Sequence, residues 1–220
     1  MSGPALLLTE SLQLDFVKPL GRFEPLPNLL HIGADEARRL MGEDPADGPV
    51  ARVMRWAYAL PDERLRLVHI RDWHDPDDPA QASHLAQFGP HCLKGTAGAA
   101  FAFSVPGGRA KDVRVVDCPT LNDFEGTGLA DDLASFRGTR ARVGIIGVWT
   151  EAKVGFLAYE LRTRYPDFEL AVCSALTAGS ARSDHFLALD QMRKLLGVRV
   201  LASVGEFERF LAGESAAETV

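Results

Sequence analysis

Asp72, His74 and His91 are the residues whose types and spacing most directly suggest chemistry. Asp72 and His74 flank one residue at the end of an apolar run, so their side chains point the same way in an extended strand. His91 follows in FGPHC and offers a third ligand. Two imidazoles and a carboxylate suit a divalent transition metal that keeps open positions for water or substrate. By itself, an Asp-x-His pair is a weak signal for a metal.

Two further stretches place polar residues after apolar runs. Gln13 and Asp15 follow ALLLT, although an aspartate beside Phe16 is most often a turn or capping residue. The turn 150–153, which contains Glu151, Ala152 and Lys153, follows the apolar run 143–148. In open α/β sheets, ligands bind at the carboxyl ends of strands, where helices begin. These stretches are therefore predicted to lie at the site.

The elements that must position these residues alternate between strand and helix. Short apolar and β-branched runs predict six strands, at 5–9, 65–70, 113–116, 143–148, 170–173 and 198–201. Helical spacing predicts helices at 34–41, 50–60, 131–136, 150–165, 183–196 and 204–211, with Thr150 as an N-cap. The segment 71–108 is rich in Asp, Pro and Gly and is predicted to be irregular. This alternation predicts a three-layer α/β/α fold around a central parallel six-stranded sheet, of the Rossmann-like type.

Length and composition limit the class of protein. The 220 residues contain no dividing linker, which predicts a single domain over 1–213 and a disordered tail over 214–220. The net charge of -6 comes from interspersed acids and bases, which argues against nucleic acid or an anionic membrane as a partner. Three cysteines without metal-knuckle spacing argue against a disulfide framework. With no membrane-spanning run and no basic signal-peptide start, a cytoplasmic protein is expected.

Five motifs in one order give the chain a resemblance to a known family. They are LLLTESLQLDFV, DWH followed by PHCLKGTAGAAF, FEGTGL, GVWTEAKV and SARSDHFLAL. Over nearly its whole length, the chain resembles the isochorismatase-like cysteine hydrolases, and among them the nicotinamidases. The resemblance implies that Asp15 is the general base. It also implies that Asp72, His74 and His91 bind a divalent metal, expected to be zinc, with no organic cofactor.

Three positions depart from the pattern of that family. Cys118 stands where the family has its catalytic lysine, and Lys153 stands where it has its nucleophilic cysteine, so the two residue types are exchanged. Ser11 stands where the family often has an aspartate on the first strand. A helix N-terminus disfavours the Lys153 ammonium by only roughly 0.3 to 1 kcal/mol. Losing one donor of an oxyanion hole is more serious, at about 2.7 to 4 kcal/mol, if Cys118 attacks from the third strand.

The resemblance also implies a substrate pocket at these strand ends. A cis peptide is expected between Val148 and Trp149, a costly form without proline and so a mark of a functional turn. Trp149 replaces a small residue and is expected to narrow the pocket. Phe23 and Phe88 either line the pocket or close it, and Trp73 is either a platform or simple packing. The expected wall consists of Gln13, Phe23, Trp73, Val148, Trp149 and Thr150.

Two classes of function remain open at this point. In the first, the protein hydrolyses the C–N bond of a small-molecule amide: Cys118 attacks the carbonyl, Asp15 shuttles the proton and Lys153 supports the charged states. In the second, it is a catalytically altered or inactive member of the fold that binds a small molecule or acts as a scaffold, with Cys118 and Lys153 as pocket wall. Taken alone, Cys118 would most simply be an inert buried thiol. The resemblance further implies a homo-oligomer, either a dimer or a tetramer.

Overall fold

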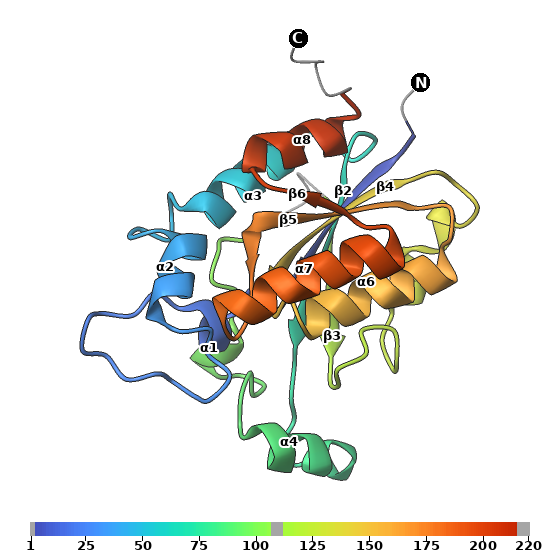
Figure 1. Ribbon diagram of the computed structural model, residues 1–220. Coiled ribbons are helices and arrows are strands. Elements are labelled where there is room, and N and C mark those ends of the chain that lie inside the picture. Colours follow the sequence, from blue (N-terminus) through green and yellow to red (C-terminus); the bar gives the residue numbers. More distant parts are fainter. Residues whose placement is uncertain (1–2, 107–111, 215–220) are drawn as a thin grey trace.

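A parallel sheet of six strands forms the centre of the molecule in the computed structural model, which describes residues 3–106 and 112–214 (Figure 1). The strands are β1 (Ala5–Glu10), β2 (Arg66–Asp72), β3 (Val113–Cys118), β4 (Arg142–Val148), β5 (Glu169–Ala178) and β6 (Arg199–Leu201). Every pairing between neighbouring strands is parallel. The predicted sheet is thereby confirmed, whereas nearly all of the predicted disordered tail lies outside the described residues.

The strand order is β3-β2-β1-β4-β5-β6, so the chain builds one half of the sheet outward from β1 and the other half outward from β4. All six residues of β1 are buried, as expected for a central strand covered on both faces. The order of the strands reverses between β1 and β4, and such a switch point opens a crevice at the carboxyl ends of the strands. The fold therefore predicts the position of the site before any side chain is considered.

Helices cover both faces of the sheet. They are α1 (Leu14–Val17), α2 (Ala34–Met41), α3 (Pro49–Ala59), α4 (Ala82–Phe88), α5 (Leu129–Asp132), α6 (Lys153–Arg164), α7 (Arg182–Leu196) and α8 (Val204–Ala212). Apolar side chains of α2, α3 and α8 pack with one face of the sheet, and those of α5, α6 and α7 pack with the other. Helices α6 and α7 run side by side across their face, whereas α4 projects from the carboxyl end of the sheet (Figure 1). The three predicted layers are present.

The structure differs from the sequence-based expectations in three local places. Residues 71–108 are not wholly irregular, because they contain α4. The loop after the first strand contains the single turn α1. The predicted helix 131–136 is split into α5 and a 3-10 turn, Ala134–Phe136. These elements are one or two turns long, and so short a helix has little hydrophobic periodicity to reveal it.

The start of α6 also differs from expectation. Helix α6 begins at Lys153 with Ala152 as its N-cap, not at Thr150. The Thr150 hydroxyl is instead 2.8 Å from Nδ1 of the buried His185, and the Thr150 N–H donates to the carbonyl of Ala178. The turn before α6 is therefore tied to β5 and α7, which fixes the direction in which Lys153 leaves the sheet.

No helix within residues 3–106 and 112–214 combines the length and the apolar character that crossing a membrane requires.

Candidate functional site

A cavity of about 250 Å³ lies at the carboxyl ends of the central strands. Its wall is mostly apolar and aromatic, with a polar group of side chains at one end. The lining residues are Ser11, Phe16, Leu30, Asp72, His84, Phe88, His91, Leu121, Val148, Trp149, Ala152, Lys153 and Phe156. This volume is near the lower end for ligand pockets, so the cavity suits a small molecule.

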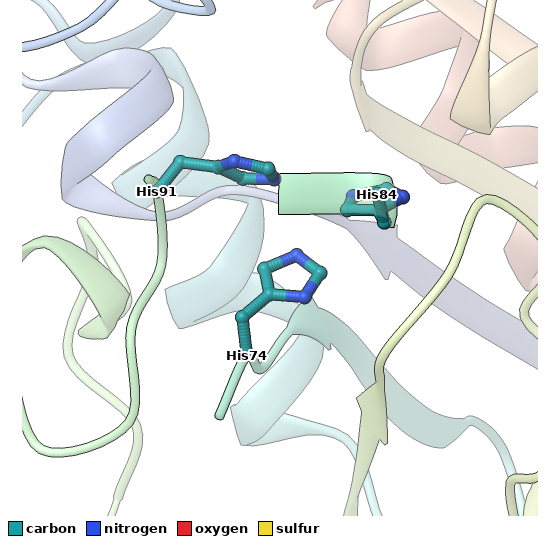
Figure 2. A group of neighbouring side chains, drawn as sticks. All are labelled: His74, His84 and His91. Carbon is teal, nitrogen blue, oxygen red and sulfur yellow. The ribbon is translucent and has the colours of Figure 1, made fainter. Parts of the chain in front are cut away.

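Three histidines gather beside this cavity. Rings of His74, His84 and His91 face one another (Figure 2), and each residue offers a nitrogen within 4.8 Å of those of the other two. His74 follows β2, His84 lies on α4, and His91 lies in the loop after α4. A backbone bridge from His74 to Leu93 holds the end of this loop against the end of β2. The ring centroids of His74 and His91 are 4.5 Å apart.

The hydrogen bonds of these rings fit a divalent metal. Nδ1 of His74 is 3.0 Å from the side-chain oxygen of Gln81, and Nδ1 of His91 is 2.7 Å from the carbonyl of Gly89. Both oxygens can only accept, so each Nδ1 carries a proton, and in the neutral ring each Nε2 has a lone pair available to a metal. Within the described part of the chain, Nε2 of His74 and Nε2 of His84 are buried without a hydrogen-bond partner. Buried lone pairs that converge in this way are what a zinc-like ion would satisfy.

Asp72 completes the group, as the sequence predicted, but it also faces a second partner. Its Oδ2 lies 3.7 Å from Nε2 of His91 and 3.9 Å from Nε2 of His74. Its Oδ1 lies 3.1 Å from the Nζ of Lys153. Burial would raise the pKa of Asp72, but the Lys153 ammonium holds that pKa well below its usual range. Asp72 is therefore an ionised carboxylate at neutral pH.

His84 is a site residue that sequence reasoning missed. It stacks on His74 with the ring centroids 4.7 Å apart, and burial together with the two other histidines lowers its pKa to about 4. A neutral imidazole is the form that binds a metal. The sequence feature that could have revealed α4, and with it His84, is Gly89. This glycine ends α4 with a positive φ of 77°. A helix ending there places His84 one turn before Phe88, on the side facing the cavity.

Lys153 lies at the centre of a buried network of charges. Its Nζ is 2.6 Å from Oδ1 of Asp123, 3.1 Å from Oδ1 of Asp72 and 3.8 Å from Oε1 of Glu10. Only 5% of Lys153 is exposed. Burial would lower the pKa of this amine, but the surrounding carboxylates raise it well above its usual range. Lys153 is thus a fixed ammonium, and neither Asp123 nor Glu10 was predicted as its partner.

Cys118 is close to Lys153 but is not part of the cavity wall among the described residues. Its Sγ lies 3.3 Å from Nζ of Lys153 and donates to the carbonyl of Thr120 at 3.0 Å. The residue is fully buried and is not among the described residues that line the cavity. Burial raises the pKa of the Cys118 thiol to about 12, although the Lys153 charge acts in the opposite direction. The protonated thiol is therefore the favoured form at neutral pH, and Cys118 contributes no wall to the cavity among the described residues.

The structure does not bring Asp15 to the other two predicted catalytic residues. Its carboxylate accepts a hydrogen bond of 2.6 Å from the N–H of Cys92, next to His91. Among the contacts described for residues 3–106 and 112–214, none joins Asp15 to Cys118 or Lys153. Asp15 therefore braces the loop that carries His91. This use of an aspartate to fix a loop is the ordinary alternative to a catalytic role.

The predicted pocket wall is correct in part. Val148 and Trp149 line the cavity and are joined by a cis peptide bond, as the resemblance implied, and Phe88 lines it too. Gln13, Trp73, Phe23 and Thr150 are absent from the described lining. Phe23 is 90% exposed. Trp73 stacks on the guanidinium of Arg71 at 3.7 Å.

Gln13 has a structural role behind the wall. Its amide nitrogen donates to the carbonyls of Asp72 and Ala99, and its oxygen accepts from the N–H of Asp72. It therefore clamps the end of β2 from the segment that follows β1. Asp72 is held in place by this clamp, so Gln13 serves the site without touching the cavity.

A parallel α/β fold with a small cavity and a histidine cluster at its switch point places this chain among the α/β proteins with a small-ligand site at the carboxyl ends of the strands. The isochorismatase domain matches residues 35–203, and the chain therefore belongs to the isochorismatase family. The matched segment includes the three histidines, Cys118 and Lys153, whereas Ser11 and Asp15 precede it. No curated protein sequence matches the chain.

Several solved structures share the fold. An isochorismatase-like hydrolase from Alkaliphilus metalliredigens is 20% identical, with 94% of this chain and 98% of that chain covered and a TM-score of 0.70. A nicotinamidase/pyrazinamidase from Bacillus subtilis is 19% identical, with 90% and 100% covered and a TM-score of 0.68. A pyrazinamidase from Pyrococcus horikoshii, in complex with zinc, is 22% identical, with 91% and 99% covered and a TM-score of 0.66. At these identities, the likeness establishes the fold.

Proposed function

We propose that this member of the isochorismatase family hydrolyses the C–N bond of a small amide in the cavity beside the histidine cluster, with a divalent metal bound there. The observation that carries the proposal is the convergence of the free nitrogens of His74, His84 and His91 beside Asp72, on the wall of an otherwise apolar cavity. Among the structural neighbours, a nicotinamidase/pyrazinamidase and an N-carbamoylsarcosine amidase carry names that denote amide substrates. Their names support an amide as the substrate class.

The cavity separates the two ends of such a substrate. Phe16, Phe88, Trp149 and Phe156 supply flat apolar surface for a ring. Ser11, Asp72, His84, His91 and Lys153 supply the polar end, where a carbonyl would lie. Trp149 and the small volume limit the ring to a single small one. A substrate with one planar ring and one amide group fits both ends.

The histidines would hold the metal, with zinc as the expected ion. A metal in that position supplies Lewis acidity toward a carbonyl or water oxygen. The chain itself prepares the site: Gln81 and the carbonyl of Gly89 orient the rings of His74 and His91. Lys153 places a fixed positive charge at the polar end, where it can stabilise negative charge that develops on a carbonyl oxygen.

The cysteine mechanism expected from the family resemblance finds little support in the geometry. Cys118 is buried behind the cavity wall, its thiol is protonated at neutral pH, and Asp15 is engaged with Cys92. These observations favour a second candidate function, in which the protein binds a small amide without cleaving it. The two candidates share the cavity and the metal residues and differ only in turnover.

Ammonia release tests the proposal. The zinc-loaded protein would be incubated with nicotinamide, pyrazinamide and benzamide, and compared with His74→Ala and with Cys118→Ala. We expect ammonia from at least one amide, loss of the activity in His74→Ala, and activity retained in Cys118→Ala. Calorimetric binding of an amide without any ammonia release would establish the binding function instead. No binding and no release with any of the three would overturn the proposal.

A further inference from the structure

We propose that Ser11 is the nucleophile of this site, with Glu10 as its general base and Lys153 as the group that orients the base. The inference rests on the proposed hydrolytic function and assigns the catalytic group that Cys118 cannot supply. Ser11 directly follows β1, at the point where the strand order reverses, and it lines the cavity. It is the one hydroxyl among the lining residues described for the cavity.

The backbone at Ser11 has the geometry of an exposed-nucleophile turn. Ser11 follows β1 directly and precedes α1, which is a strand-turn-helix arrangement. Its φ is 50°, in the left-handed region that residues other than glycine rarely adopt. Its N–H donates to the carbonyl of Ile70 at 3.0 Å, so the strained conformation is held by the neighbouring strand. Strain of this kind concentrates at functional positions, and it is how sharp turns present a nucleophilic serine.

The Ser11 hydroxyl already has a base within reach. Its Oγ donates to Oε1 of Glu10 at 2.7 Å, and it lies 3.4 Å from Oδ1 of Asp72. A hydroxyl is a weak nucleophile unless a neighbouring base takes its proton as it attacks. The distance to Glu10 is within the range required for such a transfer. The nucleophile and its base are therefore adjacent in sequence and in space.

The position of Glu10 suits a general base, because its carboxyl group lies in the interior beside Ser11 and not at the surface. It is fully buried, and its second oxygen, Oε2, has no hydrogen-bond partner among the described residues. Its first oxygen, Oε1, lies 3.8 Å from Nζ of Lys153. Lys153 is itself fixed by Asp72 and Asp123, so the base is oriented by a group that cannot swing away. Ser11, Glu10 and Lys153 therefore form a catalytic triad in the general sense, in which a third group orients the base that activates the nucleophile.

In the reaction, Ser11 first takes the acyl group from the amide, and water then releases that group as the acid. Oγ of Ser11 forms a bond to the carbonyl carbon while its proton passes to Oε1 of Glu10. The C–N bond then breaks, and Glu10 returns the proton to the departing amine. A water molecule next gives a proton to Glu10 as its oxygen bonds to the acyl carbon; the C–Oγ bond breaks, and Ser11 recovers its proton from Glu10. The net change is the conversion of amide and water into acid and amine.

An alkyl fluorophosphonate, which reacts with activated serine hydroxyls, tests the assignment. The zinc-loaded protein is treated at a series of pH values from neutral upward, because burial raises the pKa of Glu10 and only its ionised form can take the Ser11 proton. The protein is then digested, and the modified peptide is located by mass spectrometry. We expect one adduct, on Ser11, and none on Ser183, an exposed serine that also neighbours a carboxylate, Asp184. Because general base catalysis contributes about 100-fold or more, Glu10→Gln should slow the labelling by about that factor. Ser183→Ala serves as the matched control and should label like the wild type.

The outcomes separate this inference from the proposed function. Ammonia release that persists in folded Ser11→Ala, or the absence of an adduct on Ser11 in the wild type, would overturn the nucleophile assignment and leave the proposed hydrolysis standing. An adduct on Ser11 without release of ammonia from any amide would support the nucleophile and reject the amide substrate. Should Ser11→Ala fail to fold, Ser11→Cys keeps the shape of the side chain, and alkylation of that thiol, slowed by Glu10→Gln, would support the assignment.

Discussion

Nζ of Lys153, at the start of α6, lies 3.3 Å from Sγ of Cys118, at the end of β3. The two residue types that the sequence shows to be exchanged therefore do meet in space. Their meeting does not create a reactive thiol, because the sulfur faces the carbonyl of Thr120 and is fully buried. As a result of the exchange, the ammonium of Lys153 is part of the cavity wall, whereas Cys118 is not among the described lining residues.

Replacing Lys153 should cost the fold much of its stability. Lys153→Met leaves the carboxylates of Asp72 and Asp123 buried without their cation, and removing one partner of a buried ion pair costs about 3 to 5 kcal/mol. The free energy of unfolding in urea measures this loss. Lys194→Met is the matched control, because Lys194 pairs with Asp190 at the surface and such a pair contributes less than about 1 kcal/mol. Equal losses in both variants would contradict the buried network.

Zinc binding should depend on Gln81, which is not itself a ligand. Gln81→Leu removes the oxygen that fixes the ring and the tautomer of His74, and such supporting partners contribute about 10 to 100-fold in metal affinity. Titration calorimetry with zinc measures the change. Gln191→Leu, an equivalent substitution at an exposed position of α7, should leave the affinity unaltered. An unchanged affinity in Gln81→Leu would mean that His74 does not bind the metal.

Stability should depend on pH through Glu10. Burial, together with Asp123 and Asp72, raises the pKa of Glu10 well above its usual range, although Lys153 and Ser11 act the other way. In the unfolded chain, the Glu10 carboxyl has a pKa of about 4.3. At pH values between that pKa and the raised pKa of the folded state, folded Glu10 holds a proton that unfolded Glu10 has lost. Stability therefore falls as pH rises through that window.

Glu10→Gln cannot ionise, so it should lose that dependence. The difference in the free energy of unfolding between Glu10→Gln and the wild type should grow in favour of the variant as pH rises above about 4.3, and it should level off once Glu10 ionises in the folded protein, the form that can act as a base. Urea unfolding at several pH values measures the trend. Parallel stability curves for the two proteins would show that Glu10 keeps an ordinary pKa in the fold.

The three cysteines should react slowly in the folded protein. Burial raises the pKa of Cys118 to about 12 and that of Cys173 to about 11, and it raises the pKa of Cys92 further still. At neutral pH, the thiolate of Cys118 is then about 3,000-fold scarcer than that of an exposed cysteine, whose pKa is about 8.5. Iodoacetamide labelling followed by mass spectrometry measures the rates, and all three thiols should label readily in guanidinium. Fast, selective labelling of native Cys118 would restore the cysteine mechanism.

Much of the fold could be predicted from the sequence, because strand and helix signals are local. Runs such as 143–148 are continuous and apolar, as buried parallel strands require, and Ala34–Met41 shows the helical period. The boundaries failed where helices are short: α1 and α4 contain too few residues to show a period. The missed α4 carries His84, so this failure of local prediction also hid one member of the histidine cluster.

The sequence alone determined that Asp72, His74 and His91 share a strand end and the loop that follows it. It also determined that a lysine and a cysteine are exchanged at Lys153 and Cys118, because residue type and spacing are properties of the chain. Only the tertiary structure decided which side chains reach the cavity. The Asp15 carboxylate accepts a hydrogen bond from the N–H of Cys92, and Glu10 and Asp123 pair with Lys153. Ser11 lines the cavity. Such choices depend on contacts between segments thirty or more residues apart and on the direction of each side chain, which no local pattern records.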